Sequence, residues 1–299
     1  GQKLRDRFPT ATILFEEPMK GHTTFRIGGP ADIYIEPDYS DIIPLIDFIK
    51  AEAAAFTIIG NGSNLLVMDD GIEGVVISLG KKASGITITG NTIAVEAGAL
   101  LSQVSSVAAD AQLTGMEFAS GIPGSIGGAV YMNAGAYGGE IKDIIESVLV
   151  LTETGEKKLM TAEDLQLSYR HSILMEQGGY VLSAVLKLKH GDKAMIKATI
   201  DDIRAKRIEK QPLNFPSAGS TFKRPEGYFA GKLIDDAGLR GYTVGGAQVS
   251  EKHCGFVINR DNATAKDVLQ LMQDVDSMVY DKFGVHLVPE VRIIGRNID

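Results

Sequence analysis

The most informative stretch of this sequence is SGIPGSIGGAVYMNAGAYG, residues 120–138. Its glycines would weaken any helix or strand, because a glycine loses more backbone entropy on folding than other residues do. Close approach of a ligand to the main chain explains them better. Gly127 and Gly128 would let a flat or phosphorylated cofactor lie against the backbone, while Ser125 and nearby N–H groups bond its polar edge.

A second glycine-rich loop, GNGSN at residues 60–64, stands between two apolar runs that read as strands. Its glycines permit positive φ, so that consecutive N–H groups would curl into an anion-binding concavity. A Rossmann site is disfavoured because the third glycine of GxGxxG is missing and a strand follows; without GK[ST], a P-loop is excluded. A plain Asn-Gly hairpin turn stays open for this stretch alone. Together, the two loops suggest a long dinucleotide laid across two successive domains.

The chain around these loops divides into three predicted domains. Residues 1–80 read as an α/β unit, with a strand at 31–37 and a helix at 40–54 opened by a Ser40 cap. Residues 81–191 read as an α+β unit, whose expected elements are a hairpin at 85–99, a helix at 100–111, and strands within 146–160 and 180–189.

The third predicted domain, residues 192–299, is again α+β. An amphipathic helix over 192–211 should stop at Pro212, because proline cannot continue a helix. Its other expected elements are helices at 229–237 and 263–283, short strands within 243–259, and a strand at 291–295.

Composition restricts the class of protein. The 299 residues are 44% hydrophobic, ample for two or three packed units. No apolar run approaches the roughly 18 residues of a membrane span, and no signal-peptide core follows the N-terminal charges, so a soluble, cytoplasmic protein without membrane insertion is expected. The single Cys254 cannot form an intramolecular disulfide or hold zinc with a second cysteine, which agrees with a reducing compartment and no metal site.

The net charge of −8 should repel nucleic acid and anionic membranes, so no nucleic-acid partner is expected. A polyanionic ligand would have to meet a local group of cations. The sequence offers one such group: Arg204, Lys206, Arg207, Lys210, Lys223 and Arg224. A solvated helix face is the alternative interpretation of its first four members.

Six blocks of the chain carry a family resemblance: TTFRIGGPADIYIEP, IIGNGSNLLV, GIPGSIGGAVYMNAGAYG, LSYRHSIL, QPLNFPSAGSTFKRP and LVPEVRIIG. In this order and spacing, over nearly the whole chain, they resemble the UDP-N-acetylenolpyruvoylglucosamine reductases. The resemblance implies an α+β protein with a vanillyl-alcohol-oxidase (PCMH)-type FAD-binding fold of two subdomains, followed by a C-terminal α+β substrate-binding domain. The domains at 1–80 and 81–191 would hold FAD, and 192–299 the substrate.

The resemblance also implies a reaction. Members of the family are flavoprotein oxidoreductases with non-covalent FAD. They use NADPH to reduce the enolpyruvyl ether of UDP-N-acetylglucosamine to UDP-N-acetylmuramate for peptidoglycan synthesis, and so serve cell wall biogenesis, cell shape and cell division. The expected partners are therefore a UDP-sugar and NADPH. A monomer or a weak homo-oligomer is expected.

Three residues match the catalytic positions of the family: Arg170, Ser220 and Glu290. Hydride addition to the enolpyruvyl double bond leaves negative charge on the adjacent carbon and the carboxylate. A permanently charged, bidentate guanidinium suits that charge, and a protonated Glu290 would share the task if burial raises its pKa. Ser220 would then protonate the carbanion. Taken singly, the three also read as a surface arginine, a turn serine and an edge-strand glutamate.

The resemblance assigns further residues to ligands. Those expected at FAD are Gly60, Asn61, Gly62, Ser63, Asn64, Leu65, Gly121, Ile122, Pro123, Gly124, Ser125, Gly127, Gly128, Val181 and Arg207. Those expected at the substrate are Tyr169, Lys223, Arg224, Gln248 and His253. A purely structural histidine is an equal alternative for His253.

One subgroup of the family carries an inserted loop with a substrate-clamping tyrosine, and this chain reads as the short type without it. About ten residues join Arg170 to the next strand, a normal connection length. Thr221 stands where family members often carry an aromatic residue. The alternative functions are another FAD-dependent oxidoreductase of the same fold, such as an alcohol oxidase, or a flavin-binding module without turnover.

Overall fold

The computed structural model describes residues 1–297, which form two compact units. Unit 1 consists of Gly1–Leu14, Tyr34–Asn61 and Val75–Lys206, and unit 2 consists of Phe15–Ile33, Gly62–Gly74 and the described chain from Arg207 onward. The chain passes between the units inside β1 (Thr12–Pro18), β2 (Pro30–Glu36), β5 (Ile72–Ser78) and α6 (Lys193–Lys210), and in the loop between β3 (Phe56–Ile59) and β4 (Leu65–Val67).

The N-terminal region contains a four-stranded sheet in the order β1-β2-β5-β3, in which β3 and β5 are parallel. A short helix, α1 (Gln2–Arg7), precedes it, and α2 (Ile42–Ala51) follows β2. The sequence did not indicate β1. The Ser40 cap is wrong: Ser40 lies in a 3-10 turn, and Asp41 occupies the N-cap of α2.

The strands on both sides of the GNGSN loop confirm the expected strand, turn, strand order, but they do not form a hairpin. β3 pairs with β5, whereas β4 pairs in parallel with β18 (Arg292–Ile294). The plain hairpin alternative is therefore wrong. The apolar strand sequences contain no register signal that could have separated the two arrangements.

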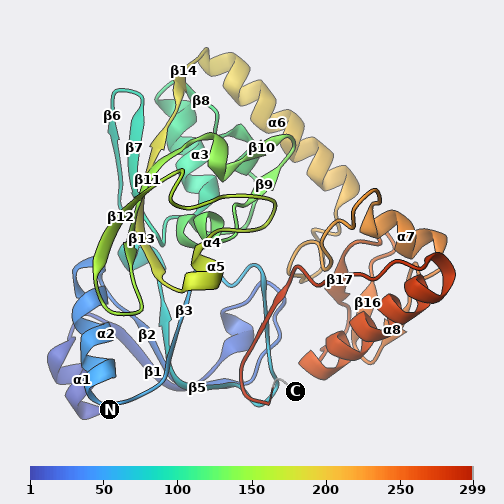
Figure 1. Ribbon diagram of the computed structural model, residues 1–299, viewed down its shortest axis with the longest axis horizontal. Helices are drawn as coiled ribbons and strands as arrows, with labels where there is room; N and C mark the ends of the chain where they lie inside the picture. The colour runs from blue at the N-terminus through green and yellow to red at the C-terminus, as the bar shows by residue number, and fades with distance from the viewer. Residues whose placement is uncertain (298–299) are drawn as a thin grey trace. The chain divides into compact units, whose positions relative to one another are not determined.

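Unit 1 has a five-stranded antiparallel sheet in the order β12-β11-β13-β7-β6 (Figure 1). The expected hairpin is confirmed, with Thr89 opposite Thr92 at its turn. Helix α4 packs on β13 and β7 through buried Ile126, Ala129 and Val130. The elements of this part of the chain are β6 (Ile86–Thr89), β7 (Thr92–Glu96), α3 (Leu101–Asp110), β8 (Leu113–Thr114), α4 (Ile126–Tyr131), β9 (Gly135–Ala136), β10 (Gly139–Glu140), β11 (Ile145–Leu151), β12 (Lys157–Thr161), α5 (Leu174–Gln177), β13 (Tyr180–Lys187) and β14 (Lys189–His190).

Helix α6 occupies nearly the expected range and ends two residues before Pro212. It is less amphipathic than expected, because Ile196 and Ile203 are the buried residues on it. Lys206 forms an exposed ion pair with Asp202 at 2.6 Å, one turn away. Lys206 therefore lies on a solvated helix face, which is the alternative interpretation of this group of cations.

Unit 2 packs α8 (Ala265–Phe283) against β15 and β16 of a three-stranded antiparallel sheet, and α7 (Ala230–Asp236) against α8 (Figure 1). The strands are β15 (Thr243–Val244), β16 (Ala247–Val249) and β17 (Val257–Asn259). Thr264 caps α8 by accepting from the N–H of Asp267. Gly284 ends the helix in the left-handed region, where glycine is favoured. The core also includes Phe25, Ile27 and Leu66, from the first two stretches of the unit.

Candidate active site

The GNGSN loop is divided between the units. Gly60 and Asn61 belong to unit 1, and Gly62, Ser63 and Asn64 to unit 2. A Cβ on Gly60 would clash with the hydroxyl of Ser125, and the side-chain amide of Asn61 donates to the carbonyl oxygen of Pro123. Within unit 1, the two glycine-rich stretches therefore touch. Gly62 has φ +61° and lies so close to the carbonyl of His22 that a side chain would not fit.

Ser125 is the N-cap residue of α4, yet its hydroxyl makes no capping hydrogen bond. The side chain is 2% exposed, and its Oγ has no hydrogen-bond partner among the described residues. A buried hydroxyl without a partner is costly, which favours a ligand atom as its missing partner. The residues present thus fit a polar cofactor at the contact between the two loops.

Not every N–H group of this passage is available to a ligand. Ile126 donates to Ala99 at 2.9 Å, and Gly127 donates to Ala97 at 2.8 Å. A Cβ on Gly127 would lie 3.0 Å from the Cβ of Ala97, so this glycine is needed for packing on the neighbouring segment. The sequence interpretation attributed it to a ligand alone.

The remaining residues expected at FAD lie in both units. Gly121, Ile122, Pro123 and Gly124 form the turn that leads into α4. Val181 lies on β13 opposite Val150 and is 6% exposed. Leu65 begins β4 in unit 2, and Arg207 lies on the last turn of α6, also in unit 2.

Arg170 lies in a tight turn of unit 1 that Ser168 and His171 close by exchanging two main-chain hydrogen bonds of 3.1 and 3.2 Å. Its φ of +53° is uncommon for a residue with a side chain and marks a constrained position. The guanidinium Nη2 donates to the carbonyl of Gly135 at 3.0 Å, and its carbon lies 5.1 Å from the ring centre of Tyr169. Tyr169 is 51% exposed.

Asn133 is a residue of this site that the sequence interpretation missed. It is fully buried, and its amide donates to the carbonyl of Ser168 at 2.8 Å and to the carboxylate of Glu140 at 2.6 Å. Its side-chain oxygen accepts from the N–H of Lys142 at 2.9 Å. Asn133 therefore ties the Arg170 turn to the glycine-rich passage. An asparagine inside MNAG was the available signal, since asparagine tolerates its positive φ of +45°.

The Ser220 loop lies in unit 2, where it runs beside the segment that contains Glu290. Gly219 has φ +79°, Ser220 is exposed, and the next two residues are buried. Thr221 uses all of its polar groups. Its N–H donates to Gly255 at 2.9 Å, its hydroxyl accepts from the N–H of Val257 at 2.9 Å, and its carbonyl accepts from the N–H of Glu290 at 2.8 Å. The structure thus brings Ser220 and Glu290 onto adjacent segments, joined through Thr221.

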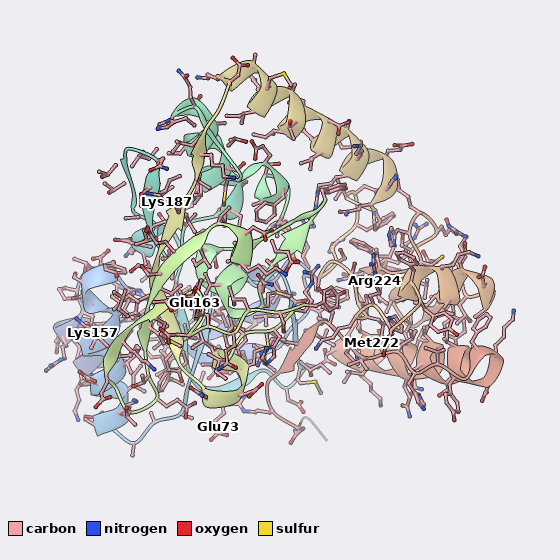
Figure 2. The ribbon with its side chains drawn as sticks, turned by 45° about the horizontal axis from the view of Figure 1, so that its top comes forward. Glu73, Lys157, Glu163, Lys187, Arg224 and Met272 are labelled. Carbon is pink, nitrogen blue, oxygen red and sulfur yellow. The ribbon has the colours of Figure 1, made fainter. Side chains whose placement is uncertain are left out.

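Three of the residues expected at the substrate, Lys223, Arg224 and Gln248, lie in unit 2 and differ from one another in their contacts. The N–H of Lys223 donates to the carbonyl of Val288 at 2.8 Å. Arg224 lies on the loop that leads to α7 (Figure 2). Its guanidinium carbon lies 4.2 Å from the ring centre of Phe229. Gln248 lines a cavity of about 370 Å³, and its Oε1 is buried without a hydrogen-bond partner among the described residues. Such an acceptor fits a ligand that brings an N–H donor.

His253 is outside the lining of this cavity. Its Nδ1 accepts from the N–H of Gly255 at 3.1 Å, which places the proton of the neutral ring on Nε2. Burial lowers the pKa of His253 below its usual value of 6.5. The histidine is therefore held in its neutral form by the fold.

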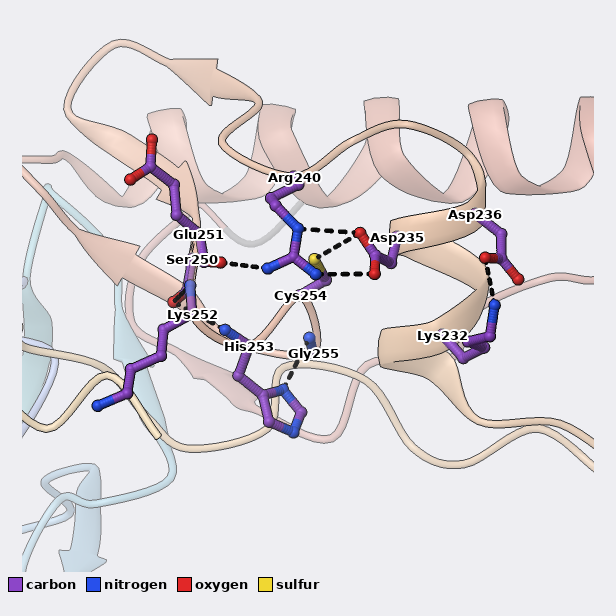
Figure 3. A network of polar contacts seen from close by, with 10 residues as sticks. All are labelled: Lys232, Asp235, Asp236, Arg240, Ser250, Glu251, Lys252, His253, Cys254 and Gly255. Carbon is purple, nitrogen blue, oxygen red and sulfur yellow. Dashed lines mark hydrogen bonds and ion pairs between the residues drawn. The ribbon is translucent and has the colours of Figure 1, made fainter. Parts of the chain in front are cut away.

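Next to His253 lies a polar network around Arg240 (Figure 3). The guanidinium binds both carboxylate oxygens of Asp235, at 3.0 and 2.7 Å, and also the carbonyl of Glu251. Arg240 holds the pKa of Asp235 below its usual range. The Cys254 thiol donates to Asp235 at 3.6 Å, and burial raises its pKa to about 11. A thiol this protonated is a poor nucleophile.

No three or more His, Cys, Asp or Glu side chains among residues 1–297 come together as a metal site would require. Among the same residues, none of the helices combines the length and the apolar character that crossing a bilayer demands.

Two protein-family models match parts of this chain. Residues 31–159 match the family model of an FAD binding domain, and residues 211–294 match the C-terminal domain of UDP-N-acetylenolpyruvoylglucosamine reductase. These matches confirm the expected fold class of an FAD-binding part followed by a reductase C-terminal domain.

Relatives resemble the chain over nearly its full length. The UDP-N-acetylenolpyruvoylglucosamine reductase of Agathobacter rectalis is 58% identical, with 98% of each chain covered. The same reductase of Caldanaerobacter subterraneus subsp. tengcongensis is 50% identical, over 98% of this chain and 97% of the relative. The crystal structure of the enzyme from Thermus caldophilus superposes with a TM-score of 0.80 at 35% identity, covering 95% of this chain and 98% of that one. The chain belongs to the UDP-N-acetylenolpyruvoylglucosamine reductase family.

Proposed function

We propose that this protein reduces the enolpyruvyl ether of UDP-N-acetylglucosamine to the lactyl ether of UDP-N-acetylmuramate, with NADPH as reductant, for peptidoglycan synthesis. The observation that supports it most is the junction in unit 2 where Thr221 joins the Ser220 loop to Glu290. An acid and a charge-stabilising carboxyl on adjacent segments are what protonation of a carbanion beside a carboxylate requires.

The three-domain division remains part of the proposal, with residues 1–80 and 81–191 holding FAD and residues 192–299 holding the substrate. When bound, FAD supplies the chemistry of receiving a hydride from NADPH and passing it to the terminal carbon of the double bond. The Ser125 hydroxyl, together with the glycines at 60–62 and 121–128, would hold the cofactor. The missing hydrogen-bond partner of Ser125 supports this assignment.

Arg170 and Glu290 would stabilise the negative charge that develops on the substrate. The guanidinium suits the carboxylate because it is planar and always charged. One of its nitrogens donates to Gly135, which orients the group without neutralising it. Glu290 is half-buried and would share the charge by donating from a protonated carboxyl.

Ser220 would give its hydroxyl proton to the carbon that carries the negative charge, which completes the addition of one hydride and one proton across the double bond. Its exposure on a loop with buried neighbours leaves the hydroxyl accessible while the backbone is held. Lys223 and Arg224 follow after Thr221 and Phe222 and would lie near the diphosphate. Gln248 would contact the uridine diphosphate, since this residue lines a cavity and its buried Oε1 lacks a hydrogen-bond partner among the described residues.

The chain would work without the inserted tyrosine loop. Between Arg170 and β13 stands only the four-residue helix α5 with its flanking turns, among the residues described there. Tyr169, directly before Arg170 and half-exposed beside its guanidinium, would offer an aromatic ring to the substrate. We place the reaction in the reducing cytoplasm, which agrees with a single cysteine and a dinucleotide co-substrate. The protein would act as a monomer or a weak homo-oligomer.

The test uses the purified holoprotein. We expect absorbance at about 450 nm, bleaching by NADPH without oxygen, and return of the colour on adding enolpyruvyl-UDP-N-acetylglucosamine. Bleaching by an alcohol instead of NADPH, with return of the colour on admitting oxygen, would indicate an alcohol oxidase. Colour that NADPH does not bleach would indicate a passive flavin binder, and a colourless protein that binds no added FAD would refute the proposal.

A further inference from the structure

Asn64 ends the glycine loop, and its contacts lie with the segment around Glu290 in unit 2. Its amide Nδ2 donates to the carbonyl oxygen of Glu290 at 3.1 Å. Its own carbonyl oxygen accepts from the N–H of Arg292 at 2.9 Å. The next residue, Leu65, begins the parallel ladder with β18. Asn64 therefore fixes the main chain at Glu290 and immediately after it.

The other side of Glu290 is held by Thr221, whose carbonyl accepts from the N–H of Glu290 at 2.8 Å. Both main-chain polar groups of Glu290 are thus bonded, one to the Ser220 loop and one to the glycine loop. Because the main chain of Glu290 is held at both its N–H and its carbonyl, the position from which its side chain extends is fixed. Displacements of about 1 Å can cost a catalytic group much of its effect.

We propose that Asn64 is a positioning residue that holds Glu290 in register with Ser220 through its side-chain amide. The inference rests on the proposed function, in which Glu290 stabilises charge on the substrate. It differs from the assignment of Asn64 to FAD, because the amide is directed at the main chain of Glu290. The glycine loop thereby serves the chemistry on the substrate as well as the cofactor.

The test replaces the amide by a group of equal shape, Asn64→Asp, in the holoenzyme. A carboxylate cannot donate to the Glu290 carbonyl. We expect substrate reduction by the prereduced enzyme to slow about 10-fold, the scale of one lost hydrogen bond at a positioned group. Flavin reduction by NADPH and the dissociation constant of FAD should stay within about two-fold of wild type, since neither uses Glu290.

A double-mutant cycle shows whether Asn64 acts through Glu290. In a Glu290→Ala background, adding Asn64→Asp should slow substrate reduction by less than about two-fold, because the side chain that it positions is already gone. A general structural defect would instead add its full effect in both backgrounds.

Asn91→Asp is the matched control. The Asn91 amide also donates to a main-chain carbonyl, that of Leu188, at 2.9 Å, but it lies at the β6–β7 turn of unit 1. Both half-reactions should match wild type in this variant. Additive effects in the cycle, or a rise of about 10-fold in the FAD dissociation constant for Asn64→Asp, would overturn the inference. If wild-type enzyme fails to reduce the substrate, the proposed function itself is refuted, and the inference falls with it.

Discussion

Replacing Ser125 by alanine should have opposite effects on the apoprotein and on its complex with FAD. The buried hydroxyl has no partner among the described residues and does not cap α4, so the apoprotein loses no hydrogen bond in the variant. Removing an unsatisfied buried hydroxyl should raise the free energy of unfolding by about 1 kcal/mol. If FAD supplies the missing partner, its dissociation constant should rise about 10-fold, which corresponds to ~1.4 kcal/mol.

The assay needs flavin-free protein. Urea denaturation of the apo forms measures stability, and the change in flavin fluorescence on titration measures affinity. Neither readout depends on turnover, so the test is independent of the assignment of Ser220.

Ser105→Ala is the matched control for this prediction. Ser105 lies on α3, is 2% exposed, and also has an unpartnered Oγ. Its removal should stabilise the apoprotein by a similar amount, with about 0.5 kcal/mol added for the better helix former. FAD affinity should not change. If Ser125→Ala also leaves FAD affinity unchanged, or if it destabilises the apoprotein, the role given to the Ser125 hydroxyl is refuted.

Ser220→Ala should leave NADPH-driven flavin reduction near wild type and slow substrate reduction about 10²-fold in anaerobic stopped-flow measurements; equal slowing of both steps would make Ser220 structural. Because burial lowers the pKa of His253 below 6.5, the unfolded chain takes up that proton first, so this contribution to stability is present above pH 6.5 and is lost as the pH falls below it. His253→Gln should reduce the difference in urea midpoint between about pH 7.5 and about pH 5.5, and an unchanged difference would count against the lowered pKa. At pH 8, about one thousandth of Cys254 would be thiolate at a pKa of about 11, so native protein should resist a disulfide reagent that labels one thiol after unfolding; rapid native labelling would contradict the burial.

Elements with local sequence signals were predictable. The hairpin at residues 86–96, α3, α6 and α8 all follow from turn residues, apolar spacing and helix ends within the segment itself. Strand pairings between distant parts of the chain were not predictable, because an apolar strand does not specify which sheet it joins. The strands β3 and β4 show this most clearly, since they flank one short loop yet pair with β5 and β18.

The candidate site likewise has features that the sequence indicates and features that it does not. Residue types such as arginine, serine and glutamate indicate their chemistry directly. The polar residues that hold them in place do so through main-chain atoms, and a sequence does not indicate which carbonyl an amide will meet. Asn133 and Thr221 are examples, because their partners, Ser168 and Glu290, lie far along the chain.

The division of unit 2 into three stretches has a consequence for its synthesis. Phe25, Ile27 and Leu66 leave the ribosome early, but the other residues of their core, among them Val268 and Leu271, come only after the long stretch Val75–Lys206 has been made. Until then these apolar side chains lack the C-terminal residues of their core, and a nascent chain stalled before Arg207 would expose them to chaperones or aggregation. Expression of the C-terminal stretch alone would have the complementary defect, since it lacks β4 and these three core residues.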